Sequence, residues 1–157
     1  MPDARPEDVA SVDAIIAALY DSISGPAGPR DWDRLRSLIH DGGRLIPTGD
    51  RPNGQSGVDV LDVEAFIVSA SEFMAGHGFY ESEVARREER FGNIAHAFST
   101  YETRWAADDP EPFMRGINSI QLLNAGGRWW VVTIFWDNES EGSPIPSRYL
   151  GGADEAS

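Results

Sequence analysis

The chain has 157 residues, of which 41% are hydrophobic and 25% charged, so it has the size and composition of one globular domain rather than of a disordered or collagen-like chain. It contains no cysteine, which excludes disulfides, thiolate metal sites and a thiol nucleophile. The net charge of −13, with arginine as the only basic residue type, disfavours nucleic acid and anionic membrane surfaces as partners. No apolar run approaches the ~20 residues of a membrane span, and the polar N-terminus lacks a signal-peptide core, so we expect a cytoplasmic protein.

The N-terminal half is predicted to form three helices. The first ends at the Gly and Pro residues of 25–29, and its apolar residues recur every three or four positions: Val9, Val12, Ile16, Leu19 and Ile23. Asp31 is a plausible N-cap of a short second helix. A third helix is predicted from about Asp62 to Ala75, where Gly76 suits the position after its last turn.

The C-terminal half is predicted to form strands. Extended stretches are expected at about 79–91, 93–106, 113–124 and 128–137, with a hairpin turn at 124–127. A short strand is expected at 44–46, followed by a Pro- and Gly-rich loop at 47–59. Helices followed by an antiparallel meander indicate an α+β domain with its helices on one face of the sheet.

Strict alternation along the last three strands groups the even-numbered residues on one face, which is largely apolar. Apolar walls with a few polar groups are typical of a small-molecule pocket. This face contains the polar residues His96, Thr100 and Asn118 and the apolar residues Ile94, Phe98, Ile120, Leu122, Trp130, Val132, Ile134 and Trp136. The odd face is also apolar, so we expect a homodimer through this outer face of the sheet.

The segment 81–90 alternates between acidic and basic residues. Such a pattern is typical of cross-strand ion pairs on a solvated face. We therefore predict that Glu81, Glu83 and Glu88 form ion pairs and do not belong to a site.

The order of these elements, together with three short motifs, resembles the nuclear transport factor 2-like superfamily, which includes SnoaL-like and ketosteroid-isomerase-like proteins. The motifs are Asp31-Trp32, Gly92-Asn93-Ile94-Ala95-His96 and Gly127-Arg128-Trp129-Trp130-Val131-Val132. The resemblance covers residues 7–137 and implies a cone-shaped, cystatin-like fold with three N-terminal helices on a strongly curved, mostly antiparallel sheet. It gives one domain over residues 1–137 and leaves 138–157 as an extended, partly disordered tail.

The resemblance also implies roles for a few residues. Isomerase relatives place a tyrosine donor in the first helix, where Tyr20 stands, and the position of their carboxylate base falls nearest Pro47, with Asp50 three residues later. Their second carboxyl lies on a late strand, but residues 113–124 contain no Asp or Glu, so the ketosteroid pattern is incomplete. Dehydratase relatives use a pair of histidines, and only His96 lies on a candidate pocket strand.

We therefore expect a pocket for a small, largely apolar molecule bearing a carbonyl or hydroxyl group. His96 is the candidate acid or base, with a buried, hydrogen-bonded histidine as the competing interpretation. Tyr20 is the second catalytic candidate, because it could donate to a developing oxyanion, and Asn118 could orient the ligand. The expected walls are Trp32, Phe98, Ile120 and Trp136.

Proton transfer of this kind needs no cofactor, and the three histidines are not spaced as metal ligands. The chain would then be a cofactor-independent lyase or isomerase. The alternative is a non-catalytic ligand-binding or dimer-scaffold domain of the same fold.

Overall fold

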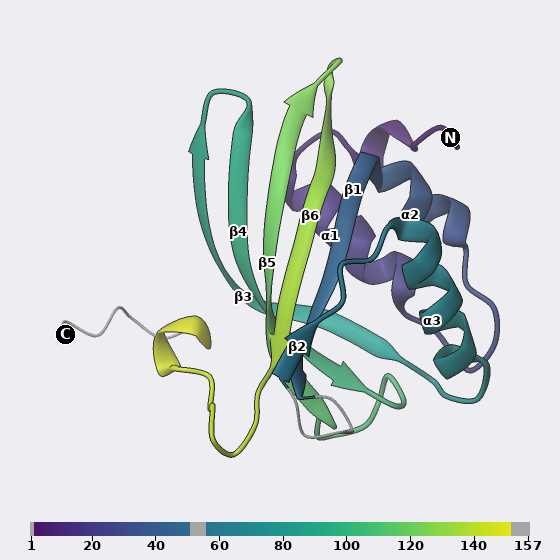
Figure 1. Ribbon diagram of the computed structural model, residues 1–157, viewed down its shortest axis with the longest axis vertical. Helices are drawn as coiled ribbons and strands as arrows, with labels where there is room; N and C mark the ends of the chain where they lie inside the picture. Colours follow the sequence, from purple (N-terminus) through teal and green to yellow (C-terminus); the bar gives the residue numbers. More distant parts are fainter. Residues whose placement is uncertain (1, 51–55, 152–157) are drawn as a thin grey trace.

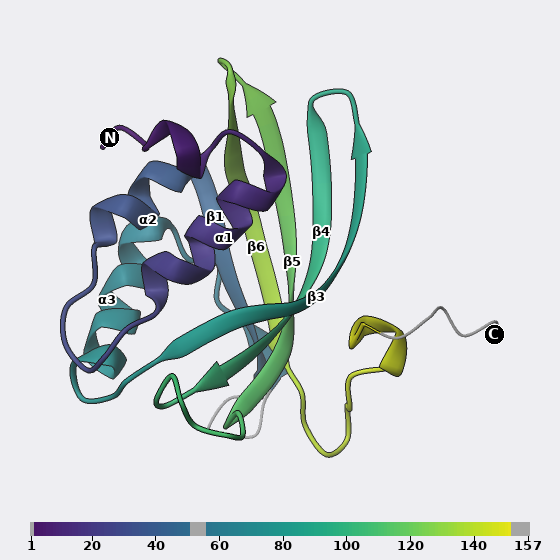
Figure 2. The ribbon, with the colours of Figure 1, turned by 180° about the vertical axis from the view of Figure 1, so that it is seen from behind.

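The structure is a computed structural model that describes residues 2–50 and 56–151. Its three α-helices lie on one face of the sheet, as Figures 1 and 2 show from opposite sides. The helical elements are η1 (Pro6–Asp8), α1 (Val12–Ile23), α2 (Trp32–Leu38), α3 (Val63–Ala75) and η2 (Ser147–Tyr149). The strands are β1 (Ile39–Asp50), β2 (Ser56–Val58), β3 (Tyr80–Phe91), β4 (Ile94–Arg104), β5 (Met114–Ala125) and β6 (Arg128–Asn138).

Each of the three α-helices begins after a polar side chain that caps its first turn. Ser11 accepts a hydrogen bond from the backbone N–H of Ala14 (3.0 Å), and Asp62 accepts one from that of Ala65 (2.8 Å). Asp31 caps α2 in the same way, as the sequence predicted. The three predicted helices are therefore confirmed.

The strands form one six-stranded sheet in the order β2-β1-β6-β5-β4-β3. All neighbouring strands are antiparallel except β1 and β6, which are parallel. The α+β class and the mostly antiparallel sheet are confirmed. The sheet is not strongly curled, however, so the expectation of a strongly curved sheet was too extreme.

The first strand is much longer than predicted. β1 runs over 12 residues, from Ile39 to Asp50, and includes 47–50, the first part of the segment expected to be a loop, of which 51–55 lie outside the described residues. Gly42 adopts a positive φ of 78°, and the pairing of β1 with β6 shifts between Ile39 and Arg44. Gly42 and Gly43 therefore mark an irregularity within the strand and do not end it.

The pairing register places odd residues of β4 and even residues of β5 on the same face. Ala97 pairs with Ile120 and Ser99 with Asn118, and all four side chains are buried against the helices. The prediction that even residues of all three strands share one face is wrong for β4. It also fails in the first half of β6, because Val132 is an extra residue between the pairs Leu122–Val131 and Gln121–Thr133.

The segment after β6 returns along the outer face of the sheet. The hydroxyl of Thr100 donates to the backbone oxygen of Tyr149 (2.6 Å), and the rings of Tyr149 and Phe98 lie 5.2 Å apart. This part of the predicted extended tail thus has a defined place against β4, while the last residues lie outside the described range. The homodimer through the outer face stays a prediction.

Among the described residues, the longest helices are too short and too polar to cross a bilayer.

Gly116 provides a test of the packing between β4, β5 and β6. A Cβ at this position would overlap the hydroxyl of Tyr101 and the backbone oxygen of Asp137. We therefore expect Gly116→Ala to lower the free energy of unfolding by about 1–3 kcal/mol, measured by urea denaturation. The matched control is Gly76→Ala, where a Cβ would meet no atom within 4 Å; an equal loss in both variants would contradict the steric explanation.

Candidate functional site

A cavity of about 500 Å³ lies between the inner face of the sheet and the helices. Helix α3 contributes Phe66, Ser69, Ala70, Phe73 and Met74 to its lining. The sheet side is lined by Leu45 and Pro47 of β1 and by the inner residues of β4, β5 and β6. The volume and the apolar walls are those of a small-molecule site.

The polar groups of the lining come from six different elements. They are Tyr20 of α1, Glu81 of β3, Tyr101 of β4, Asn118 of β5 and Asn138 of β6, joined by the lone hydroxyl of Ser69 from α3. Glu81 is the one charged residue among the described residues that line the cavity. The sequence did not predict it, since it was assigned to a solvated row of ion pairs.

The end of α1 fixes Tyr20 and Glu81 beside each other. The hydroxyl of Ser24, the residue after α1, accepts a hydrogen bond from the N–H of Glu81 at 3.0 Å and donates to the backbone oxygen of Tyr20 at 2.7 Å. Next along the chain, the backbones of Gly25 and Phe79 are paired at 2.8 and 2.9 Å. The last turn of α1 is therefore held against the start of β3.

The Glu81 carboxyl has an unusual environment for an acid. It accepts a hydrogen bond from the hydroxyl of Thr103 (3.1 Å), its pairing partner on β4. Burial raises the pKa of Glu81 from 4.5 to about 7, although the hydrogen bonds from Thr103 and Asn118 act in the opposite direction. Within the described part of the chain no arginine forms an ion pair with it. Glu81 can therefore gain or lose a proton near neutral pH.

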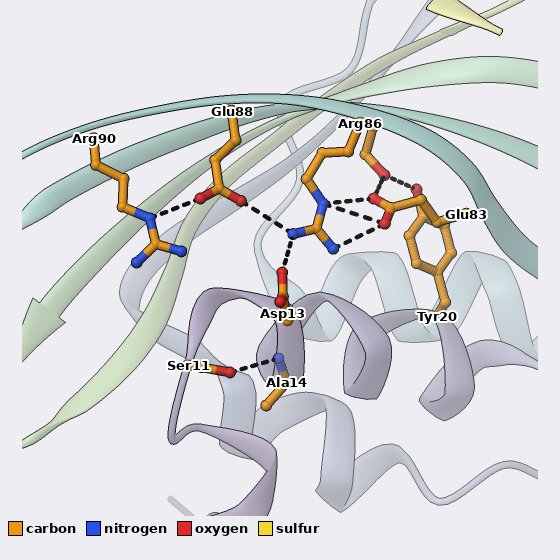
Figure 3. A network of polar contacts seen from close by, with 9 residues as sticks. Ser11, Asp13, Ala14, Tyr20, Glu83, Arg86, Glu88 and Arg90 are labelled. Atoms are coloured by element: carbon orange, nitrogen blue, oxygen red, sulfur yellow. Dashed lines mark hydrogen bonds and ion pairs between the residues drawn. The ribbon is translucent and has the colours of Figure 1, made fainter. Parts of the chain in front are cut away.

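Tyr20 sits in a directed chain of hydrogen bonds, part of which is drawn in Figure 3. Ser99 donates to the carboxylate of Glu83 at 2.5 Å, so its hydroxyl must accept from Tyr20, at 2.7 Å. The amide of Asn118 donates to the Tyr20 oxygen at 3.0 Å. Burial raises the pKa of the Tyr20 phenol, which keeps it protonated.

The chain of contacts continues to the surface beneath α1 (Figure 3). Arg86 donates to Glu83 (2.8 Å), to Glu88 (3.0 Å) and to Asp13 of α1 (2.5 Å), and Glu88 accepts a further bond from Arg90 (2.7 Å). The predicted ion pairs of segment 81–90 thus exist for these residues. These ion pairs lie beneath α1 (Figure 3). A second cavity of about 560 Å³ lies between α1 and β3, and its lining includes Tyr20, Glu81, Glu83 and Arg86.

Three of the predicted site residues, Tyr20, Asn118 and Trp136, line the cavity. Ile120 is fully buried in the core, and Trp32 packs at its edge with its ring 6.5 Å from that of Phe66. Neither of these two is among the lining residues. They support the walls from behind.

His96 and Phe98 lie on the opposite face of the sheet. The side chain of His96 is 61% exposed and its Nε2 is 3.0 Å from a carboxylate oxygen of Glu89, on the outer side of β3. Phe98 contacts Tyr149 of the C-terminal segment. The prediction that these two side chains point into the pocket is wrong, because odd residues of β4 face inward.

That the three histidines do not form a metal site stays a prediction. Among the described residues, no three His, Asp or Glu side chains are grouped as metal ligands.

Solved structures similar to this one share its fold across most of the chain. A protein of unknown function with a cystatin-like fold from Nostoc punctiforme has a TM-score of 0.64 at 10% identity, covering 83% of this chain and 90% of its own. A protein from Pseudomonas putida described as NTF2-like has a TM-score of 0.62 at 13% identity, covering 86% and 90%. An NTF2-like protein from Silicibacter pomeroyi has a TM-score of 0.55 at 16% identity, covering 83% and 94%.

No protein-family model matches the sequence, and none of the curated proteins is similar to it. At 10–16% identity the structural likeness concerns the fold alone. The NTF2-like, cystatin-like fold predicted from the sequence is confirmed.

The pKa of Glu81 predicts how stability depends on pH. Folded protein keeps the Glu81 proton up to about pH 7 and unfolded protein only to 4.5, so ionisation increasingly opposes folding as pH rises between these values. Glu81→Gln cannot ionise at this position. As pH rises from about 4.5 to about 8, we expect its free energy of unfolding, measured by urea denaturation, to increase by about 2–3 kcal/mol relative to that of the wild type.

The matched control is Glu89→Gln, which removes one carboxylate from the exposed face of the same strand. The same pH-dependent gain in both variants would show that the effect does not come from burial of Glu81.

Proposed function

We propose that the protein binds a small, largely apolar molecule in the cavity between the helices and the sheet, and that Glu81 transfers a proton on that molecule. The reaction class is that of a cofactor-independent isomerase or lyase. The observation that carries the proposal is the position of one carboxyl group, with a pKa of about 7, in the wall of an apolar cavity of about 500 Å³.

The cavity supports the binding step. Its walls combine aliphatic side chains from α1 and β1 with aromatic rings from α3 and β6, and these rings pack edge-to-face, with Phe66 and Trp136 6.1 Å apart. Displacing water from such a surface is favourable for an apolar ligand. The polar group of the ligand would meet Glu81 and Asn118.

The pKa of Glu81 supports the proton-transfer step. An acid or base is most efficient when its pKa lies near the operating pH, because both protonation states are then accessible. Ionised Glu81 would accept a proton from a carbon next to a carbonyl group, leaving an enolate, and return the proton to the same or a conjugated position. The proton count of enzyme and ligand is then unchanged over the cycle.

Tyr20 takes a different role from the donor expected from the sequence. Its proton is committed to Ser99, whose own proton is committed to Glu83. Tyr20 therefore acts as a positioning residue that accepts from Asn118 and fixes its amide. The second N–H of Asn118 can then face Glu81 or a ligand oxygen.

The same hydrogen bonds favour a second candidate function, a non-catalytic binding domain. In the described part of the chain, every buried side-chain nitrogen and oxygen has a hydrogen-bond partner. A site whose polar groups are already satisfied can hold an apolar ligand without acting on it. The two functions differ in whether bound ligand exchanges protons.

Hydrogen–deuterium exchange of a probe ketone separates these functions. Cyclooctanone is apolar, fits the cavity by volume, and has exchangeable protons only beside its carbonyl. We expect the wild type to accelerate their exchange in heavy water, followed by proton NMR, and Glu81→Gln to lower this rate by about 100-fold or more.

Glu89→Gln, on the exposed face of β3, is expected to retain the wild-type exchange rate. Saturable binding of cyclooctanone without accelerated exchange would contradict the catalytic proposal and favour the binding domain. Equal exchange rates for Glu81→Gln and the wild type would exclude Glu81 as the acid or base.

A further inference from the structure

The charges around the cavity are unbalanced. Glu81 is the one ionisable carboxyl group of the described lining, which contains neither arginine nor histidine. The nearest arginines along β3 and β4 are committed elsewhere: Arg86 to three carboxylates, and Arg104 to Glu102 (3.0 Å) and the backbone oxygen of Asp109 (2.9 Å). An ionised Glu81 therefore lacks a cationic partner from the described part of the protein.

The walls offer a second source of attraction for a cation. Aromatic rings carry partial negative charge on their faces and bind ammonium groups through cation–π interactions, which strengthen when water is excluded. Six aromatic side chains line the cavity: Tyr20, Phe66, Phe73, Phe79, Tyr101 and Trp136. A carboxylate among aromatic rings is the arrangement that suits an organic ammonium group.

The net charge of the chain acts in the same direction. At −13 the protein attracts cations and repels anions at long range. A carboxylate or phosphate ligand would have to approach this charge and then lie next to Glu81 without a compensating arginine.

We infer that the cavity selects apolar amines, with the ammonium group paired to Glu81 and the apolar body against the aromatic walls. The inference rests on the proposed function, because it names the ligand class of the same cavity. An amine that enters neutral takes the proton of the Glu81 carboxyl onto its nitrogen, which leaves a carboxylate and an ammonium group.

Pairing has a consequence for proton transfer. A carboxylate held by an ammonium group is a weaker base, and the amine fills the space that a ketone would occupy. Amines without a carbonyl group should therefore inhibit the exchange of cyclooctanone protons competitively.

Three probes with one skeleton test the selectivity: cyclooctylamine, cyclooctanone and cyclooctanecarboxylate. Titration calorimetry at about pH 8.5, above the pKa of Glu81, is expected to show the highest affinity for the amine, a lower affinity for the ketone and the lowest for the carboxylate. A charge-assisted hydrogen bond corresponds to a preference of about tenfold or more for the amine over the ketone.

In Glu81→Gln we expect the preference of the cavity for the amine over the ketone to fall by about tenfold or more. Glu89→Gln should bind all three probes like the wild type. Circular dichroism and thermal melting establish that each variant is folded, and the order of the three probes on the wild type decides the question even if Glu81→Gln does not fold.

Equal affinity for the three probes, or a preference for the carboxylate, would overturn the inference. So would amine binding that is unchanged in folded Glu81→Gln. These outcomes can be distinguished from failure of the proposed function. If the protein exchanges ketone protons but does not prefer the amine, the proton-transfer proposal stands and the amine inference fails. If the amine binds but ketone protons do not exchange, the amine inference stands and the proton-transfer proposal fails.

Discussion

The register of three neighbouring strands is the constraint on which the site depends. Glu81 of β3 pairs with Thr103 of β4, and Ser99 of β4 pairs with Asn118 of β5. Because paired residues of antiparallel strands share a face, this register brings a carboxyl, two hydroxyls and an amide to the same side of the sheet. A shift by one residue in either pair of strands would turn half of the site toward solvent.

Helices α1 and α3 also form walls of the cavity. Tyr20 reaches the polar cluster because Ser24 and Gly25 bind the backbone of β3 at the end of α1. Helix α3 closes the other side with four apolar residues and the single hydroxyl of Ser69, so most polar groups of the lining come from α1 and the sheet. Burial of Glu81 there costs stability when the carboxyl ionises, and that cost is the source of its raised pKa.

Much of the fold could be predicted from the sequence, because its signals are local. The apolar period of α1, the Asp31 cap and the Gly126-Gly127 turn act within a few residues, and each appears where it was expected. The faces of the strands could not be predicted by counting, because the pairing across each connection decides them. Counting even positions placed His96, Asn118 and Trp136 on the inner face. It is correct for Asn118 and Trp136, and wrong for His96.

Glu81 was missed for a related reason. Alternating charges look the same on a solvated strand and on a strand that lies beneath a helix, and only the packing of α1 on β3 distinguishes them. One signal was present in the sequence: Phe79 precedes Glu81 by two positions, so the carboxylate shares a face with a residue that is buried. A buried aromatic residue at the start of a charged strand indicates which carboxylates face inward.

The extra residue in β6 has an evolutionary meaning. Val132 lets Trp129 and Val131 face the helices in the first half of the strand, while Ile134 and Trp136 do so in the second. Losing Val132 would bring the pairs Leu122–Val131 and Gln121–Thr133 into one regular ladder, so Ile134 and Trp136 would still face the cavity. In distant homologues of this chain, a one-residue gap at this point in an alignment would therefore mark a regular strand with the same inward-facing residues, and not a rebuilt ligand chamber.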